Sequence, residues 1–153
     1  MHSEDLGRPC IVVGRDSGDH VAIHVLGRMH TGADDFWDGN WLVTPVEIAV
    51  GDFSGEIGAA LRAEEFRAFR QGLQKLSAAM SGQAELASME EWLTLSVAVE
   101  PSGRLSVRGR ARDRLVGGNA LSFRIDDLDQ SDLPAIIDAL EEVEVFFPVV
   151  GSP

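Results

Sequence analysis

The strongest constraint on the fold comes from two neighbouring segments in which every second residue is apolar. They are Trp92–Val99 (WLTLSVAV) and Arg104–Arg112 (RLSVRGRAR), and Pro101-Ser102-Gly103 separates them. Because successive side chains of a strand point to opposite faces, this alternation predicts two antiparallel strands with one apolar face. The polar face of the second segment carries a row of arginines, Arg104, Arg108, Arg110 and Arg112.

Further strands are predicted on the same grounds. Cys10–Gly14 and His20–Leu26 flank an Asp/Gly/Ser turn and form a hairpin. Trp41–Val50 alternates and is expected to be one strand, and Leu121, Phe123 and Ile125 belong to another. After Gly51-Asp52 the apolar residues change parity, which predicts a bulge or a tight turn at that point.

Two segments instead repeat their apolar residues every three or four positions, which is the period of an amphipathic helix. The first is predicted over about 62–80, with the stripe Phe66, Phe69, Leu73, Leu76 and Met80. The second is predicted over about 132–147, with Ser131 as its N-cap and Pro148 at its end.

These elements predict an α+β fold made of one domain, residues 1–153. We expect a two-layer sandwich in which two amphipathic helices cover one face of an antiparallel sheet, behind a flexible tail at 1–9 and a hairpin at 10–26. The other face would be solvated. It carries Thr94, Ser96, Arg108, Arg110 and Arg124, and acids such as Glu47, Glu56 or Glu85 are expected to pair with the arginines.

The charge and the cysteine content limit the partners and the location. Acidic residues outnumber basic ones by 25 to 13, which gives a net charge of −12. Such a chain repels nucleic acid and anionic membranes and attracts a basic protein. Cys10 is the single cysteine, so an internal disulfide or a cysteine metal cluster is excluded. With neither a signal-peptide pattern nor an apolar run of about 20 residues, a cytoplasmic protein is expected.

Motifs for metal binding or catalysis fail on their spacing. An EF-hand loop starting at Asp34 would place Phe36 and Pro45 where an acid and a glutamate are required. His20 and His24 share a strand face but lie about 13 Å apart, too far for one zinc ion. A G-x-S-x-G nucleophile motif and a phosphate-binding glycine loop do not occur. We therefore expect neither an enzyme nor a cofactor.

The stretch DDFWDGNW at 34–41 is the most unusual segment, because it gathers carboxylates, an amide and two tryptophans. The simpler interpretation is a turn that leads into a strand, with both tryptophans packed at the rim of the core. The alternative is a contact surface for a partner, since tryptophans beside carboxylates are typical of interface hot spots. In that case the contact residues would be Trp37, Asp38, Asn40 and Trp41.

A series of short motifs between Asp35 and Gly151 resembles the WapI-type family of bacterial immunity proteins. In order they are DFWDGNWL at 35–42, VEIAVGDFSG at 46–55, LRAEEF at 61–66, MSGQAEL at 80–86, MEEWL at 89–93, GRARD at 109–113, LSF at 121–123, LPAI at 133–136 and the FPVVG ending. The N-terminal hairpin is not part of the resemblance.

The resemblance implies a small cytoplasmic protein without catalytic activity that binds and neutralises a partner toxin domain. The acidic composition suits a basic toxin, because opposite charges raise the association rate. Two alternatives remain open. A small ligand could bind the open sheet face near Arg108, Arg110 and Arg124, or the chain could be a structural protein that associates with itself.

Overall fold

The computed structural model describes residues 7–153. Its elements follow in the order β1 (Cys10–Gly14), β2 (His20–His24), β3 (Gly27–Arg28), α1 (Phe36–Gly39), β4 (Trp41–Val43), β5 (Val46–Val50), β6 (Phe53–Ile57), β7 (Ala60–Arg62), α2 (Ala63–Ala79), β8 (Gln83–Ala87), β9 (Leu93–Val99), β10 (Arg104–Arg112), β11 (Ala120–Asp129), the 3-10 turn η2 (Gln130–Asp132) and α3 (Leu133–Phe146). Most of the predicted N-terminal tail, residues 1–6, lies outside the described part. Pro9 is buried, and its carbonyl oxygen accepts a hydrogen bond from the Val25 amide at 3.0 Å.

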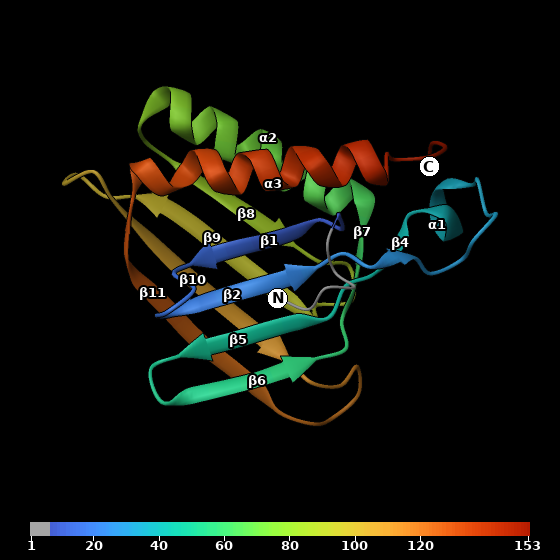
Figure 1. Ribbon diagram of the computed structural model, residues 1–153, viewed down its shortest axis with the longest axis horizontal. Coiled ribbons are helices and arrows are strands. Elements are labelled where there is room, and N and C mark those ends of the chain that lie inside the picture. The colour runs from blue at the N-terminus through green and yellow to red at the C-terminus, as the bar shows by residue number, and fades with distance from the viewer. Residues whose placement is uncertain (1–6) are drawn as a thin grey trace.

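The fold is α+β, as the sequence predicts, and every sheet in the described part is antiparallel. Sheet I has the strand order β1-β2-β5-β6, sheet II has the order β11-β10-β9-β8, and the small sheet III has the order β3-β4-β7. In Figure 1 sheet I lies in front of sheet II with its strands crossing at an angle, and α2 and α3 lie together along one side of the pair. Sheet III and α1 extend from the end where α3 terminates.

The single sheet covered by two helices is not what the chain forms. The apolar faces of sheets I and II contribute to the same core, with Ile23 and Ile48 from the first and Leu95 and Val107 from the second. Since the two sheets bury each other, the helices are needed only along one side. There α2 packs against β8 and α3 against β1. The helices close the side of a sandwich and do not cover a sheet face.

The strands differ from the prediction in two places. The predicted strand Trp41–Val50 is interrupted, because Thr44-Pro45 separates β4 from β5 and sends them to different sheets. Proline lacks the amide that a central strand would need, so it marks this boundary. Strand β8 was not predicted at all. Gly51-Asp52 is the tight turn between β5 and β6, and Gly51 has a φ of +56°.

The two long helices begin and end within one residue of the predicted ranges, but the cap of the second differs. The N-cap of α3 is Asp132, not Ser131, and it makes no side-chain cap hydrogen bond. Asp129 caps the preceding turn η2, because its carboxylate accepts a hydrogen bond from the Ser131 amide at 2.8 Å. The turn η2 then leads into α3, whose second residue is Pro134. Helix α2 ends at Met80 in the left-handed conformation, with a φ of 54°.

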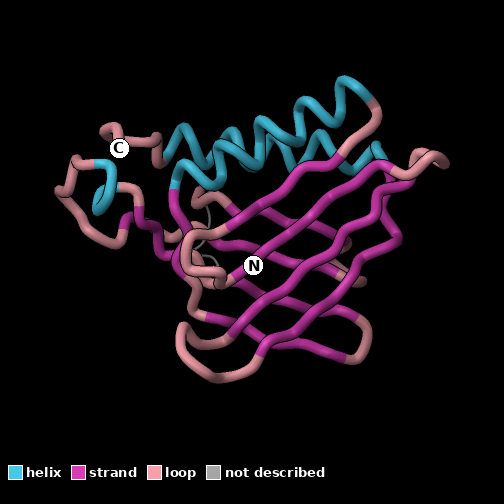
Figure 2. Tube along the Cα trace, turned by 180° about the vertical axis from the view of Figure 1, so that it is seen from behind, coloured by secondary structure: helices cyan, strands magenta, loops and turns pink. Residues whose placement is uncertain are grey.

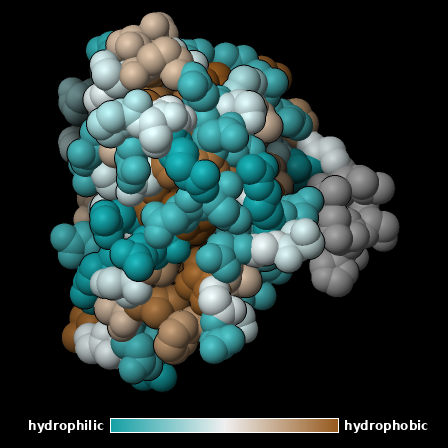
Figure 3. All heavy atoms as spheres, turned by 90° about the vertical axis from the view of Figure 1, so that its left-hand side faces the viewer, coloured by the Kyte–Doolittle hydropathy of each residue, from teal (hydrophilic) through white to brown (hydrophobic). Residues whose placement is uncertain are grey.

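Strand β6 forms the outer edge of sheet I and is unusually exposed. Four of its five residues are exposed, Ile57 is half-buried, and the Phe53 side chain is 65% exposed. Figure 3 shows the left-hand side of the molecule, where hydrophobic atoms appear among hydrophilic ones toward the lower part, the level of β6 in Figure 1. The helices close the opposite side of the sandwich, so this edge stays uncovered.

Candidate functional site

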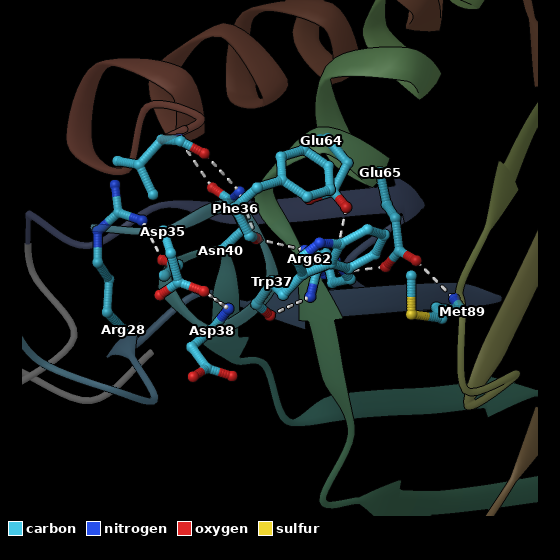
Figure 4. A network of polar contacts seen from close by, with 12 residues as sticks. Arg28, Asp35, Phe36, Trp37, Asp38, Asn40, Arg62, Glu64, Glu65 and Met89 are labelled. Atoms are coloured by element: carbon cyan, nitrogen blue, oxygen red, sulfur yellow. Dashed lines mark hydrogen bonds and ion pairs between the residues drawn. The ribbon is translucent and has the colours of Figure 1, made fainter. Parts of the chain in front are cut away.

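The DDFWDGNW segment forms a single helical turn, α1, between two exposed aspartates and β4. Asp35 caps this turn, because its carboxylate accepts a hydrogen bond from the Asp38 amide at 3.1 Å and its carbonyl accepts one from the Gly39 amide at 2.8 Å. Asp35 is therefore used locally, which supports the interpretation of the segment as an ordered turn (Figure 4).

Asn40 fixes the end of this turn to the C-terminal segment. Its side chain is fully buried and donates to the carbonyls of Phe36 at 3.0 Å and Val150 at 2.9 Å, while its carbonyl oxygen accepts from the Val150 amide at 2.9 Å. Gly39 permits this approach, since a Cβ there would lie 2.6 Å from the Val150 side chain. Residues 110 positions apart are thus held in one place.

Arg62 binds the backbone of α1 and is the largest fully buried side chain in the described part of the chain. Its guanidinium donates to the carbonyls of Phe36 at 2.6 Å and Trp37 at 2.8 Å, and to the Glu64 carboxylate at 2.5 Å. The two carbonyls belong to the first two residues of α1, and the carboxylate belongs to the first turn of α2. A buried arginine is stable only when paired in this way.

The same guanidinium lies against three aromatic rings. Its central carbon is 4.8 Å from the ring centre of Trp41, 5.2 Å from that of Phe36 and 5.7 Å from that of Trp37, all within the range of cation–π attraction. Phe36 and Trp37 also meet edge to face at 5.1 Å. Trp41 is half-buried by these contacts, whereas 55% of Trp37 remains exposed.

Glu65 connects this cluster to the turn between β8 and β9. Its carboxylate accepts hydrogen bonds from the Arg62 amide at 2.8 Å and from the Met89 amide at 2.5 Å. Burial disfavours the charged form and raises the pKa of Glu65 to about 7, although the two backbone hydrogen bonds act in the opposite direction. We call the set Phe36–Trp41, Arg62, Glu64 and Glu65 the α1 site (Figure 4).

The four residues proposed as partner contacts occupy three different environments. Trp37 and Asp38 face solvent, Trp41 is half-buried on Arg62, and Asn40 is buried with its amide fully engaged. Trp37 and Asp38 are therefore the two that a partner could touch directly. Asn40 and Trp41 hold them in position, and whether any partner binds here stays a prediction.

The arginines proposed as a ligand face are exposed on the outer side of sheet II. Arg108 lies directly opposite Arg124, and Arg124 forms an ion pair with Asp126 at 3.3 Å. The acids expected to neutralise this face do not do so. Glu47 lies 3.5 Å from His24, and Glu56 and Glu85 form no ion pair within residues 7–153.

Neither of the two best-formed hollows in the described part of the chain is lined by these arginines. The one of about 380 Å³ lies between the end of β1 and the start of α3, and its Arg15 and Asp132 are ion-paired with each other at 2.5 Å. Two of its three charged side chains are thus paired with each other and Asp16 is the third, so this hollow adds little support to a small-ligand function.

Arg62, Glu64 and Glu65 are the residues of the α1 site that lie outside DDFWDGNW and that the sequence did not identify. The available signal was an arginine within the otherwise apolar run Ala59–Ala63 (AALRA), immediately before a helix. A charge in that setting is expected to be buried and paired. Its acceptors are backbone carbonyls of α1, which cannot be found from residue types.

The fold and the α1 site define a class of protein: an acidic α+β chain that presents one exposed tryptophan on a tightly held surface turn. The chain belongs to the immunity protein WapI-like family, whose pattern matches residues 12–148. The resemblance found in the sequence is thereby confirmed, and on the N-terminal side the match extends further, since it includes most of the hairpin. The comparisons with curated proteins and with solved structures gave no match.

Two further findings bear on the sequence predictions. Within residues 7–153 there is no group of three or more histidine, cysteine, aspartate or glutamate side chains placed to hold a metal ion. His20 and His24 lie at opposite ends of β2, and His20 contacts the Gly18 carbonyl at 2.8 Å. Among the described helices none is long and apolar enough to cross a membrane.

Proposed function

We propose that this protein is an immunity protein that acts in the cytoplasm by binding a toxin domain, without catalysing a reaction. Membership of the WapI-like family supports the immunity role. Binding of a toxin, its basic character and the contact surface are our inference from the geometry of the α1 site and from the charge of the chain.

The observation that carries the proposal is the exposed Trp37 on a rigid support. An aromatic side chain contributes most to binding when it is already fixed, because little conformational entropy is then lost in the complex. Arg62 holds the backbone of α1 at the Trp37 carbonyl and also lies against the indole ring. Met89, which is 54% exposed, belongs to the turn that Glu65 binds and adds apolar surface beside the cluster.

The charge around this surface suits a basic partner. Asp34, Asp35 and Asp38 are exposed around α1, and the chain as a whole carries −12. A basic toxin would be steered toward the protein at long range and would meet carboxylates beside the tryptophan on contact.

The first experiment asks whether the protein protects against a toxin. The toxin candidate would be the product of any adjacent gene that encodes a large secreted protein. Its C-terminal domain is expressed alone and together with this chain in a bacterial host, and growth is recorded. Rescue of growth, together with a stoichiometric complex by calorimetry, is the expected result. Growth arrest that this chain does not relieve would contradict the immunity role.

The second experiment tests the contact surface with matched variants. Trp37→Ala should weaken the complex about 30-fold or more, as expected for a central aromatic contact of about 2 kcal/mol. Phe53→Ala is the control, because Phe53 is an aromatic residue with a similar exposed fraction, 65% against 55% for Trp37, but lies on β6 in sheet I. Equal affinities for the two variants would place the toxin elsewhere on the surface while leaving the immunity role intact.

A further inference from the structure

The outer surface of sheet II carries three arginines that share one side of the sheet. Arg108 on β10 lies opposite Arg124 on β11, and Arg110 lies opposite Ser122. All three arginines are exposed. Figure 2 views the molecule from the side on which sheet II lies in front. We call Arg108, Arg110 and Arg124 the arginine face.

Small residues form the floor between these side chains. On the other side of β10, Ser96 lies opposite Arg108 and Thr94 lies opposite Arg110. Neither described hollow includes any member of the arginine face. The guanidinium groups therefore stand on the exposed face of the sheet, outside both of these hollows, which suits an extended or helical segment of a macromolecule better than a small molecule enclosed in a pocket.

The charges on this face are poorly compensated from within the chain. Like charges directly opposite each other on a sheet destabilise it, yet Arg108 faces Arg124. Asp126 lies near Arg124, at 3.3 Å, but Arg108 and Arg110 have no ion pair within residues 7–153. Acidic residues outnumber basic ones by 25 to 13, yet no carboxylate of the described chain pairs with Arg108 or Arg110. The face keeps positive charge available for an external anion.

The spacing of the arginines indicates what kind of anion fits. Arg108 and Arg110 are two residues apart on one strand, about 7 Å, and Arg108 and Arg124 lie about 5 Å apart across the strands. Carboxylates on alternate residues of a strand, or four residues apart on a helix, have similar spacing. Arginine binds a carboxylate with two parallel hydrogen bonds, which favours such a match.

We propose that the arginine face is a docking surface for an acidic segment of a partner protein. The net charge of −12 opposes a long nucleic acid, which extends beyond the face, whereas a short acidic segment interacts locally, within a Debye length of about 8 Å. This surface has the opposite sign to the surroundings of Trp37. It does not depend on the proposed toxin contact.

The test uses three fluorescent probes with the full-length protein. They are an octapeptide of alternating glutamate and threonine, the same peptide with glutamine in place of glutamate, and an eight-nucleotide single-stranded RNA. Anisotropy is recorded at 50 and 300 mM NaCl. The glutamate peptide is expected to bind at low salt and to weaken at high salt, while the glutamine peptide should not bind.

Variants then locate the binding. The double change Arg108→Gln and Arg124→Gln should weaken the glutamate peptide at least about tenfold. The control is Arg8→Gln with Arg67→Gln, which removes the same charge from two exposed arginines outside sheet II. Melting temperatures verify that both double variants fold. The Arg108→Gln/Arg124→Gln variant should melt no lower than wild type, because it removes a pair of like charges that face each other.

Three outcomes would overturn the proposal. The first is failure of the glutamate peptide to bind at 50 mM NaCl. The second is an equal loss of binding in both double variants, which would reflect overall charge alone. The third is tighter binding of the RNA, lost in the Arg108/Arg124 variant, which would assign the face to nucleic acid.

Discussion

At the scale of single residues, Arg62 holds the α1 site together. Its guanidinium binds two carbonyls of α1 and one carboxylate of α2 while it contacts three aromatic rings. The sequence drew attention to Trp37 and Asn40 because DDFWDGNW gathers two tryptophans, an amide and carboxylates in eight residues. It could not reveal Arg62, whose importance depends on carbonyl groups about 25 residues away.

Replacement of Arg62 by Met should destabilise the protein by about 3–5 kcal/mol, because the Glu64 carboxylate and two carbonyls would lose their buried partner. Urea denaturation measures the change. The control is Arg67→Met on the exposed side of α2, which should change stability by less than about 0.5 kcal/mol. A loss below about 1 kcal/mol for Arg62→Met would show that α1 holds its conformation without this group.

Glu65 should make stability depend on pH. Burial raises its pKa to about 7 in the folded chain, above the ordinary value of 4.5. Between these two values the folded state binds the proton more tightly than the unfolded state. The contribution of Glu65 to the free energy of unfolding therefore decreases as pH rises through this window, and it is constant outside it.

Two measurements check this behaviour. Carbon-detected NMR should give a titration midpoint for the Glu65 carboxyl near 7, and the stability difference between wild type and Glu65→Gln should fall from pH 5 to pH 7. Glu65→Gln loses one hydrogen bond at every pH, so only the slope is informative. A midpoint near 4.5 would mean that the two backbone donors outweigh burial.

At the scale of elements, local periodicity was sufficient where a segment forms its own pattern. The long helices and the strands β9 and β10 were predictable because their stripes are continuous. Strand β8 was missed because only Ala84 and Leu86 of its five residues are buried, too few to show a period. The division at Thr44-Pro45 was missed because the apolar alternation continues through it, although the proline indicated the break.

The prediction at this scale concerns the contact between β10 and β11. A Cβ added at Gly109 would lie 2.2 Å from the Phe123 ring, so Gly109→Ala should destabilise the protein by about 1–3 kcal/mol through overpacking. Gly55→Ala in β6 is the matched control, since its Cβ meets nothing within 4 Å. Thermal melting compares the two. Equal melting temperatures would indicate that the Phe123 ring moves aside without cost.

At the scale of the whole molecule, the sequence could not distribute the strands among sheets. Alternation shows that a strand has one apolar face but does not show which other apolar face covers it. Sheet I pairs β2 with β5, which bypasses β3, α1 and β4, and those elements form or adjoin a separate small sheet. A single sheet covered by two helices and a pair of sheets closed by two helices both need strands with one apolar face and helices with one apolar stripe. The sequence pattern therefore does not distinguish these two folds.

The net charge gives a prediction that belongs to the whole chain. The association rate with a basic toxin should fall about tenfold or more between 20 and 200 mM NaCl, because steering is screened. Stopped-flow tryptophan fluorescence can follow the association. The dissociation rate should change much less. An association rate that does not respond to salt would show that the net charge of −12 does not steer the toxin toward this protein.

The uncovered edge of β6 has a consequence for handling the protein. Edge strands recruit other chains unless something keeps them apart, and Phe53–Ile57 contains neither proline nor lysine for that purpose. Mutual repulsion between molecules of charge −12 provides the separation instead. Near the isoelectric point of about 4.6 that repulsion vanishes. Light scattering should then detect reversible aggregation, which Gly55→Lys in the middle of the strand would suppress.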